Sequence, residues 1–428
     1  MRILIENGTV VDPGQSLEAI RCVYIDGNII AGVLEPDELT NVPFPKSEAD
    51  LVYDAQGKMI CPGLIDMHVH FRDPGQEYKE TIETGCKAAA QGGFTDVCCM
   101  PNTTPVNDQP EITRYMIEKA RSLGGTRVHP VAAISPGSAG KALTEMGLLL
   151  DAGACAFSDD GHPVSDSQLM RRAMEYARSF DALIISHCED LRLADGVMNE
   201  GIVSTRLGLA GIPNAAESIM VMRDIALCEL TGARLHFAHI STAQSVEALK
   251  IAKDKGLPVT AETAPHYFTL TDSAVLEYDT HAKMNPPLRS ETDREAIRQG
   301  LADDTIDVIA TDHAPHIDLE KNVPFDQAAN GIIGLETSLA LGLKLVHDNI
   351  LTFSQLIEKM SIKPADILKL PKKMIAKGQT ADLTIIDLQK VHTISAKNFR
   401  SKSKNTPFDG WTCKGVVVKT IVNGCMIN

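Results

Sequence analysis

The segment MICPGLIDMHVHFRDPG, residues 59–75, is the most informative part of the chain. An apolar run leads directly into His68 and His70, which are separated by one residue. Side chains two residues apart on a strand point to the same side, so the two imidazoles can bind one metal ion together. Arg72 adds a guanidinium, which suits a substrate with a reacting carbonyl and a separate carboxylate. The pair alone is a weak signal, because two histidines at a strand end with ordinary hydrogen bonds would look the same.

Short apolar segments alternate with amphipathic segments through the middle of the chain. Eight apolar segments are predicted strands: 64–68, 94–99, 127–133, 154–158, 182–187, 234–239, 258–262 and 306–311. The intervening segments have helical spacing, most clearly 110–123, 167–180, 215–230 and 245–255. Eight strands that alternate with helices over about 300 residues predict a (β/α)8 TIM barrel, an α/β fold.

The two flanks of this region have a different pattern. Residues 1–57 and 372–428 contain short alternating strands with Gly and Asn at the turns and little helical spacing. We expect them to form one small β-sandwich domain built from both chain ends, because the ends of a compact chain usually lie close together. The alternative is two separate appendages. The barrel is expected to span residues 58–371.

The composition limits the classes of partner. The formal net charge is −15, and 44% of the residues are hydrophobic. This charge argues against binding to nucleic acid or to an anionic membrane surface, both of which need basic patches. The sequence has no signal-peptide pattern and no segment long enough to span a membrane, and its ten cysteines are scattered. We therefore expect a cytoplasmic protein with reduced thiols.

Side chains that commonly bind metals fall at the carboxyl ends of several predicted strands. They are, in chain order, His68 and His70, the pair Asp159 and Asp160, then His187, His239 and Asp312. In a (β/α)8 barrel these strand ends converge on the mouth that holds the active site. Four histidines, one of the two adjacent aspartates and Asp312, which come from five distant segments, are therefore predicted to lie together. The alternative is a shared structural role.

The donor atoms predict the kind of metal centre. Imidazole and carboxylate ligands without a thiolate suit zinc, with manganese, cobalt or iron as substitutes. Six ligands are too many for one open catalytic zinc, which typically takes three, but they suit two ions about 3.5–4 Å apart. A carboxylate bridges two such ions well, whereas an imidazole does not.

Longer motifs make the chain recognisable as a whole. They are 66–75 (DMHVHFRDPG), 100–105 (MPNTTP), 157–161 (FSDDG), 236–242 (HFAHIST), 262–267 (ETAPHY), 283–289 (KMNPPLR), 311–316 (TDHAPH), 334–337 (GLET) and 403–408 (SKNTPF). Because these motifs occur in this order and context, the chain resembles the amidohydrolase superfamily, and within it the dihydroorotases of the type I bacterial kind. The motifs cover the chain from the first barrel strand to the tail, which makes them far more specific together than singly.

The resemblance implies a role for each predicted ligand. His68, His70 and Asp312 would hold a first zinc ion, and His187 and His239 would hold a second. Asp312 would also be the catalytic residue that takes a proton from the nucleophile and passes it to the leaving ring nitrogen.

The bridge between the two ions is a separate prediction. Many relatives use a carboxylated lysine at the end of the fourth strand, but no lysine stands there in this chain. In the type I bacterial enzymes an aspartate takes that place, and the family spacing favours Asp160 over Asp159. The resemblance thus implies two zinc ions bridged by Asp160 and a hydroxide, with Asp159 anchoring the loop.

Four further residues match positions that contact the substrate in the family. Arg72, Asn102 and His316 match those that hold the free carboxylate, and Asn285 matches one that touches the pyrimidine ring. Each has a structural alternative. Arg72 could be a surface ion-pair partner, Asn102 could cap its own turn, Asn285 could shape the turn before two prolines, and His316 could be an ordinary loop residue.

The implied reaction is the reversible cyclisation of N-carbamoyl-L-aspartate to L-dihydroorotate and water, the third step of de novo pyrimidine synthesis. One rival is another cyclic amidohydrolase, such as a dihydropyrimidinase, hydantoinase or allantoinase. A second rival is a non-catalytic subunit that scaffolds aspartate transcarbamoylase. Arg72 and the complete ligand set favour the dihydroorotase reading. The expected partners are the small-molecule substrate, further copies in a homo-oligomer such as a dimer, and aspartate transcarbamoylase in a complex.

Overall fold

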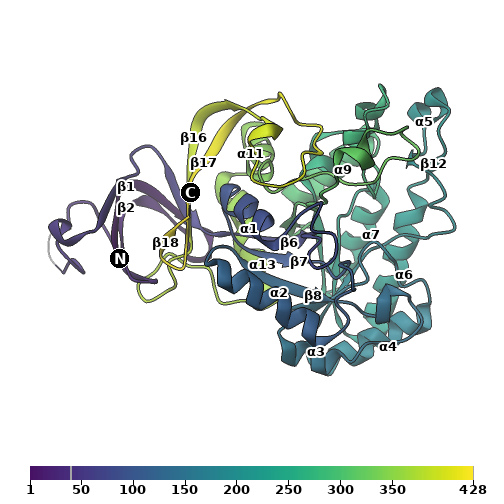
Figure 1. Cartoon of the computed structure of the whole chain (residues 1–428), viewed down its shortest axis with the longest axis horizontal. Helices are drawn as coiled ribbons and strands as arrows, with labels where there is room; N and C mark the ends of the chain where they lie inside the picture. Colours follow the sequence, from purple (N-terminus) through teal and green to yellow (C-terminus); the bar gives the residue numbers. More distant parts are fainter. Residues whose placement is uncertain (39–40, 428) are drawn as a thin grey trace.

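Eight parallel strands form the barrel in the computed structural model, which describes residues 1–38 and 41–427 (Figure 1). In chain order they are β6 (Leu64–Val69), β7 (Phe94–Cys99), β8 (Arg127–Ala132), β9 (Ala156–Phe157), β10 (Leu183–Ser186), β13 (Arg234–Phe237), β14 (Val259–Thr263) and β15 (Val308–Ile309). Each of these strands pairs in parallel with the next. The predicted (β/α)8 barrel is confirmed. Strands β9 and β15 are shorter than predicted at both of their ends.

Side chains complete the barrel between its first and last strands. Asp66 on β6 accepts hydrogen bonds from the backbone N–H of Thr311 at 3.0 Å and from its hydroxyl at 2.5 Å. The N–H of His70 donates to the carbonyl of His313 at 2.9 Å. Burial raises the pKa of Asp66 to about 7. These bonds hold the His68–His70 segment directly beside Asp312.

Helices surround the barrel as an outer layer (Figure 1). The longer ones are α1 (Ile82–Gln91), α2 (Pro110–Leu123), α3 (Met146–Ala152), α4 (Ser167–Arg178), α6 (Ala215–Thr231), α7 (Ala243–Asp254), α9 (Glu291–Ala302) and α11 (Ser338–His347). The shorter ones are α5 (Ile202–Leu207), α8 (Pro265–Thr269), α10 (Asp318–Lys321), α12 (Phe353–Ile357) and α13 (Lys363–Leu368). The four helices predicted from spacing correspond to α2, α4, α6 and α7. Apolar side chains such as Met67, Val131 and Ile185 fill the barrel interior, so the mouth has a solid floor.

Strands from both chain ends form a second sheet. They are β1 (Arg2–Asp12), β2 (Leu17–Asp26), β3 (Ile29–Leu34), β4 (Leu51–Asp54), β5 (Met59–Pro62), β16 (Leu383–Thr393), β17 (Thr412–Val422) and β18 (Cys425–Met426). β5 joins the two ends, because it pairs with β1 in parallel and with β16 antiparallel. The predicted β domain from both chain ends is confirmed, and the alternative of two separate appendages is wrong. Both termini lie on this side of the molecule (Figure 1).

The limits of the two domains stay a prediction. The boundary predicted at residues 57 and 58 leaves β5 with the barrel, whereas its hydrogen bonds place it in the second sheet. Gly63 alone separates β5 from β6, so one continuous segment runs from that sheet into the first barrel strand. A small two-stranded sheet, β11 (Met198–Asn199) with β12 (Gly211–Ile212), lies between β10 and α6 in the chain.

Two further properties bear on the sequence-based expectations. Within the described residues, no helix is both long and apolar enough to cross a lipid bilayer. All ten cysteines belong to the described part of the chain, and each is a free thiol.

Candidate metal centre and substrate site

Asp160 lies in the middle of the four predicted histidine ligands. Its Oδ1 is 3.3 Å from Nε2 of His68 and 3.5 Å from Nε2 of His239. The same oxygen is 3.7 Å from Nδ1 of His187, and Oδ2 is 3.5 Å from Nε2 of His70. All five side chains are buried. One carboxylate therefore faces four imidazoles from the ends of three other strands, β6, β10 and β13.

Asp312 completes the cluster on one side of Asp160. Its Oδ1 is 3.1 Å from Nε2 of His70 and 3.6 Å from Nε2 of His68. His68, His70 and Asp312 form a group whose ligand atoms all lie within 4.8 Å of one another, which makes them a candidate metal site. This is the ligand set that the family resemblance implies for the first ion.

The second candidate group differs slightly from the predicted set. It contains His68, Asp160 and His239, again with ligand atoms within 4.8 Å of one another. His187 lies beside it, with its Nδ1 2.8 Å from Nε2 of His239. The structure therefore brings all six predicted ligands into one cluster, and it places His187 and His239 next to each other.

The two adjacent aspartates face in different directions. Asp159 accepts a hydrogen bond from the backbone N–H of Ser135 at 3.0 Å and another from the Ser135 hydroxyl. It thereby ties the loop after β9 to the loop after β8. Asp160 faces the histidines instead. This geometry supports Asp160 rather than Asp159 as the bridge.

Three residues of the site adopt backbone conformations that L-residues rarely take. The φ angles of Arg72, His239 and Asp312 are 59°, 35° and 47°. Non-glycine residues in this region are uncommon and strained, and they cluster at functional sites. The chain at these strand ends is therefore held in position by its surroundings, and local preference alone would not produce it.

A carboxylate that the sequence analysis did not assign supports the first histidine. Oε1 of Glu262, on β14, lies 2.6 Å from Nδ1 of His68, and its Oε2 lies 3.2 Å from Nε2 of His236. Nδ1 of His236 is in turn 2.8 Å from the Thr260 hydroxyl. A carboxylate on one ring nitrogen directs the other toward the metal. His236 is thus a buried residue that supports Glu262 and is not itself a member of the ligand cluster. The available signal was that Glu262 opens a motif near the end of a barrel strand.

Two other histidines of the cluster have comparable supports. Nδ1 of His70 is 2.8 Å from Oδ1 of Asn102, and Nε2 of His187 is 3.5 Å from Oε2 of Glu189. The first contact means that the Asn102 carboxamide orients a predicted metal ligand with its oxygen, which leaves its nitrogen for another partner. Glu189 was missed by the sequence analysis, because an acidic residue two positions after a strand end has no distinctive spacing.

The cluster fits a metal in its chemistry. Nε2 of His68 and Oδ1 of Asp160 are buried and make no hydrogen bond within the described part of the chain. Buried polar atoms are normally satisfied, so an unsatisfied nitrogen and oxygen that face each other indicate a site for a bound cation. Burial opposes charge on both groups, but their mutual attraction holds the pKa of His68 well above and that of Asp160 well below the usual values.

Arg72 lies beside this cluster without a charged partner. Its Nε is buried and has no hydrogen-bond partner, and its guanidinium makes no ion pair, as far as residues 1–38 and 41–427 are concerned. Burial lowers its pKa. A guanidinium normally pairs with a carboxylate when it is withdrawn from water. The predicted alternative of a surface ion pair is not what the structure shows, and the group is available for an anionic ligand.

The predicted contact His316 belongs to a polar trio. Its Nδ1 is 2.8 Å from Oε2 of Glu320 and 3.5 Å from Nζ of Lys79, which itself lies 2.9 Å from Oε1 of Glu320. Burial and the charge of Arg72 lower the pKa of His316 to about 3. His316 is therefore neutral at pH 7. Asn285 lies elsewhere at the mouth, where it hydrogen-bonds Glu189; despite burial, His187 and, to a smaller extent, Asn285 hold the pKa of Glu189 below its usual value.

Two other histidines near the strand ends are not part of the ligand cluster. Nε2 of His313 is 3.4 Å from Oε2 of Glu80, and its Nδ1 accepts from the N–H of Gly334 at 3.2 Å. His266 is buried beside Tyr267, and burial lowers its pKa to about 4. Their contacts thus lie outside the ligand cluster, although His313 follows Asp312 in the chain and His266 lies near Asp312 in space.

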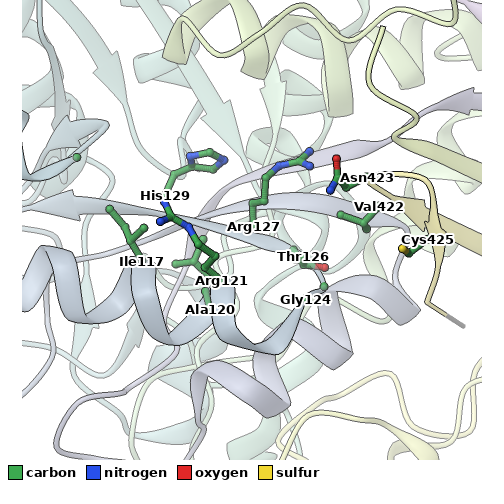
Figure 2. A pocket seen from close by; sticks show the side chains of 13 residues that line it. Ile117, Ala120, Arg121, Gly124, Thr126, Arg127, His129, Val422, Asn423 and Cys425 are labelled. Atoms are coloured by element: carbon green, nitrogen blue, oxygen red, sulfur yellow. The ribbon is translucent and has the colours of Figure 1, made fainter. Parts of the chain in front are cut away.

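A cavity of about 580 Å³ lies away from these ligands, where β8 begins (Figure 2). Its walls come from the C-terminal half of α2, from the start of β8 and from the turn between β17 and β18. Figure 2 shows Arg121 of α2, His129 of β8 and Asn423 of that turn among its lining residues. The predicted ligands lie at the opposite, carboxyl ends of the strands, so this cavity is separate from the metal cluster.

Comparison with known proteins places this arrangement in a family. The sequence profile described as Dihydro-orotase-like matches residues 57–245. A dihydroorotase from Syntrophus aciditrophicus (strain SB) is 52% identical over 428 residues, which cover 100% of this chain and 99% of the relative. A dihydroorotase from Desulfotalea psychrophila (strain LSv54) is 60% identical over 373 residues, 87% of this chain and 88% of the relative. These relatives confirm the resemblance found in the sequence.

Solved structures support the fold. An L-hydantoinase (dihydropyrimidinase) from Arthrobacter aurescens is 25% identical and superposes with a TM-score of 0.88, covering 99% of this chain and 95% of its own. A dihydropyrimidinase from Brevibacillus agri NCHU1002 is 22% identical, with a TM-score of 0.82 over 100% of this chain and 95% of its own. Barrel and flanking β domain therefore occur together in known structures.

Proposed function

Because the chain belongs to the dihydroorotase family of cyclic amide hydrolases, we propose that it interconverts N-carbamoyl-L-aspartate and L-dihydroorotate. The forward reaction closes the ring and releases water, and it is the third step of de novo pyrimidine synthesis. The observation that carries the proposal is the pairing of two features at one mouth: a carboxylate surrounded by four histidines, and an arginine without a charged partner.

The metal ligands are assigned as the sequence predicted. His68, His70 and Asp312 would hold one zinc ion, and His187 and His239 would hold a second. Asp160 would bridge the two. Bound there, the two ions would lower the pKa of a water molecule and stabilise negative charge on the reacting carbonyl oxygen.

Asp312 is proposed to move the proton. Its carboxylate lies at the edge of the cluster, 3.1 Å from Nε2 of His70, and the charges of His68 and His70 help to keep its pKa low despite burial. It is therefore ionised at neutral pH and able to act as a general base. In the hydrolytic direction it would accept the proton of the nucleophile and deliver it to the ring nitrogen; in the biosynthetic direction it would accept the proton of the ureido nitrogen.

Three residues are proposed to hold the free carboxylate of the substrate. Arg72 would supply charge and a two-pronged hydrogen bond, Asn102 its amide nitrogen, and His316 its ring. Asn285 would contact the pyrimidine ring. Nδ1 of His316 donates to Oε2 of Glu320, so its Nε2 would donate to the carboxylate only after the negative charge of the substrate has favoured a second proton on the ring. By fixing the carboxylate, these groups would bring the ureido nitrogen and the reacting carbonyl together.

The two rival functions make different demands on the site. A hydantoinase or dihydropyrimidinase acts on a ring without a carboxylate, which would leave Arg72 without a partner. A non-catalytic scaffold would have no need for six clustered ligands. A homo-oligomer, a complex with aspartate transcarbamoylase and a cytoplasmic location stay predictions.

The test is a substrate comparison with the purified protein. Turnover is measured with dihydroorotate, with N-carbamoyl-L-aspartate and with dihydrouracil, which lacks the carboxylate. We expect turnover in both directions, and we expect dihydrouracil to react more than about a thousandfold more slowly, since a guanidinium that the bound ring shuts off from water without a partner costs about 3–5 kcal/mol. Comparable turnover of dihydrouracil and dihydroorotate would overturn the proposal in favour of the dihydropyrimidinase rival.

A further inference from the structure

Residues 399–408, here called the strap, leave the flanking β domain and lie against the barrel mouth. They connect β16 to β17, whose far ends are part of the second sheet. Figure 1 shows this yellow segment reaching from the β16–β17 pair toward the green helices of the barrel. The strap contains the sequence motif 403–408, for which neither the metal cluster nor the proposed substrate contacts supply a reason.

Asn405 is the most closely bonded residue of the strap. It is 1% exposed, and its carboxamide makes three hydrogen bonds to backbone groups of the barrel. Oδ1 accepts from the N–H of His316 at 3.0 Å. Nδ2 donates to the carbonyl of Ala314 at 2.9 Å and to the carbonyl of Gly331 at 3.0 Å. The side chain thus crosslinks the two arms of the β15–α11 connection, one before and one after α10.

The loop to which Asn405 is hydrogen-bonded carries Asp312, the proposed general base, and His316, a proposed substrate contact. It begins at Asp312 and reaches His316 four residues later, so Asn405 bonds both the proposed substrate contact and a backbone carbonyl two residues before it. The carbonyl of Asn405 also accepts from the N–H of Ile333 at 3.0 Å. Backbone groups before, at and beyond His316 are therefore all fixed by one strap residue.

The strap also bonds the segment of Lys79 and Glu80, which lies next to His316. The Ser403 hydroxyl donates to the carbonyl of Lys79 at 2.7 Å, and the N–H of Lys402 donates to Oε1 of Glu80 at 3.0 Å. Nζ of Lys79 lies 3.5 Å from Nδ1 of His316. One segment of the flanking domain consequently sets the spacing between the Lys79 loop and the His316 loop.

We propose that Asn405 is a positioning residue that fixes His316 for the free carboxylate of the substrate. The inference rests on the proposed function for its kinetic consequence, although the contacts themselves do not depend on it. It gives the flanking β domain a part in substrate binding, since the strap is the insertion between two of its strands. Asparagine suits the task because one end of its side chain accepts a hydrogen bond while the other donates two.

Asn405→Asp tests this requirement with almost no change of shape. An ionised aspartate can still accept from the N–H of His316, but it turns a second oxygen toward the carbonyls of Ala314 and Gly331, which repel it. Asn398→Asp is the matched control, because Asn398 is exposed, lies near the strap in the chain, and undergoes the same substitution. Asn405→Ser is a second variant, which removes the repulsion and keeps a small polar group in case the aspartate does not fold.

The measurement combines steady-state kinetics with dihydroorotate, metal content and hydrogen exchange of the peptide that contains residues 313–320. In Asn405→Asp and Asn405→Ser we expect KM to rise at least about tenfold, kcat to fall by a smaller factor, and metal content to stay that of the parent. We also expect faster exchange of this peptide, because the N–H of His316 loses its fixed acceptor. Asn398→Asp should match the parent in all three.

The outcomes separate this proposal from the proposed function. Unchanged KM and unchanged exchange in both Asn405 variants would overturn the positioning role. A loss of metal with kcat falling and KM constant would also overturn it, by assigning Asn405 to the support of the metal centre. If the parent protein fails to turn over dihydroorotate, the proposed function fails, and the exchange comparison still decides whether Asn405 fixes the His316 loop.

Discussion

The two ends of the barrel both bury charged groups, but they treat them in opposite ways. At the amino ends of the strands, Asp96, Arg127, His129, Lys373 and Asp382 form what we call the base cluster. Nζ of Lys373 lies 2.7 Å from Asp96 and 2.8 Å from Asp382, and Arg127 contacts both carboxylates. His129 lies 2.9 Å from Asp96. Each charge here has an opposite charge within hydrogen-bond distance.

At the carboxyl ends, charge is matched far less completely. Asp160 and Asp312 lie together among four histidines, Arg72 has no carboxylate partner in the described residues, and buried donor and acceptor atoms are left without hydrogen bonds. The base cluster joins Asp382 of the flanking domain to Asp96 of β7, which is a structural task. The difference teaches that a buried charge by itself does not mark function. Several unpartnered donors and acceptors gathered at one place are the stronger sign, because together they can hold a ligand.

The largest effect is expected at the centre of the mouth. Asp160→Ala should remove the carboxylate shared by four histidines, strip at least one metal ion and lower turnover by more than about 10⁴-fold. Asp159→Ala removes only the tie to Ser135 and should damage activity much less. Metal analysis and kinetics of the two variants check this. The reverse ranking would mean that the bridge is misassigned.

The proton-transfer role predicts the next largest effect. Asp312→Asn keeps an oxygen for the metal but cannot accept a proton, so turnover should fall by about 10²–10⁴-fold in both directions, with a much smaller loss of substrate binding. The acidic limb of the pH profile of kcat should disappear as well. A variant that retains a tenth or more of the parent rate would exclude Asp312 as the general base.

A smaller effect is expected at the unpaired arginine. Arg72→Met should lose most dihydroorotate activity, on the order of 10²–10³-fold, and should narrow the preference over dihydrouracil because the unpaired charge is gone. Arg72→Lys should recover only part of the activity, since lysine supplies charge without the planar fork. Kinetics with both substrates give the answer. Full activity of Arg72→Lys would mean that charge alone suffices and that the two-pronged contact is not made.

A substitution in the base cluster should lower the stability of the fold without changing the rate of the reaction. Asp382→Asn keeps the shape but removes a charge that faces Lys373 and Arg127, so the free energy of unfolding should fall by about 2 kcal/mol. The value of kcat should stay within about twofold, because the substitution lies at the opposite end of the barrel from the metals. Urea unfolding at fixed zinc concentration and steady-state kinetics are the measurements. A large loss of kcat with unchanged stability would contradict the assignment of a structural role to the amino ends of the strands and a functional role to their carboxyl ends.

The smallest effect concerns how that stability depends on pH. Lys373 and Arg127 outweigh burial and hold the pKa of Asp382 below its usual value, and the same is true of Asp96. A lowered folded-state pKa contributes stability above the unfolded value of about 3.9 and loses it as the pH falls further. The difference between parent and Asp382→Asn should thus be constant from about pH 7 to 5 and narrow below about pH 4. A difference that widens in acid would contradict the assigned pairing.

The sequence predicted the parts of the molecule that obey regular periods. Eight apolar segments, helical spacing between them and the two-residue separation of His68 and His70 are local patterns, and strand ends in a barrel must converge. The six metal ligands could therefore be predicted from the sequence without the structure. The choice of Asp160 over Asp159 came from family spacing, and the structure supports it through the contact of Asp159 with Ser135.

Contacts between distant segments could not be predicted in the same way. Glu262 on His68 and Asn405 on His316 depend on which side chains meet after folding, and neither position has a period that marks it. The left-handed backbone of Arg72, His239 and Asp312 also goes against local preference, so only the assembled barrel imposes it. The membership of β5 in the second sheet follows from its pairing with β1 and β16, which its short apolar sequence does not specify.

Charged and polar groups at the barrel mouth lack protein partners among the described residues because, on this account, two metal ions bind there around Asp160. Elemental analysis of freshly purified, active protein tests it most directly, with Asp160→Ala and Asp382→Asn analysed in parallel. We predict two zinc ions per chain in the parent and in Asp382→Asn, or one tightly held and one labile, and a clear loss of metal in Asp160→Ala. Active parent protein without any transition metal would contradict the claim.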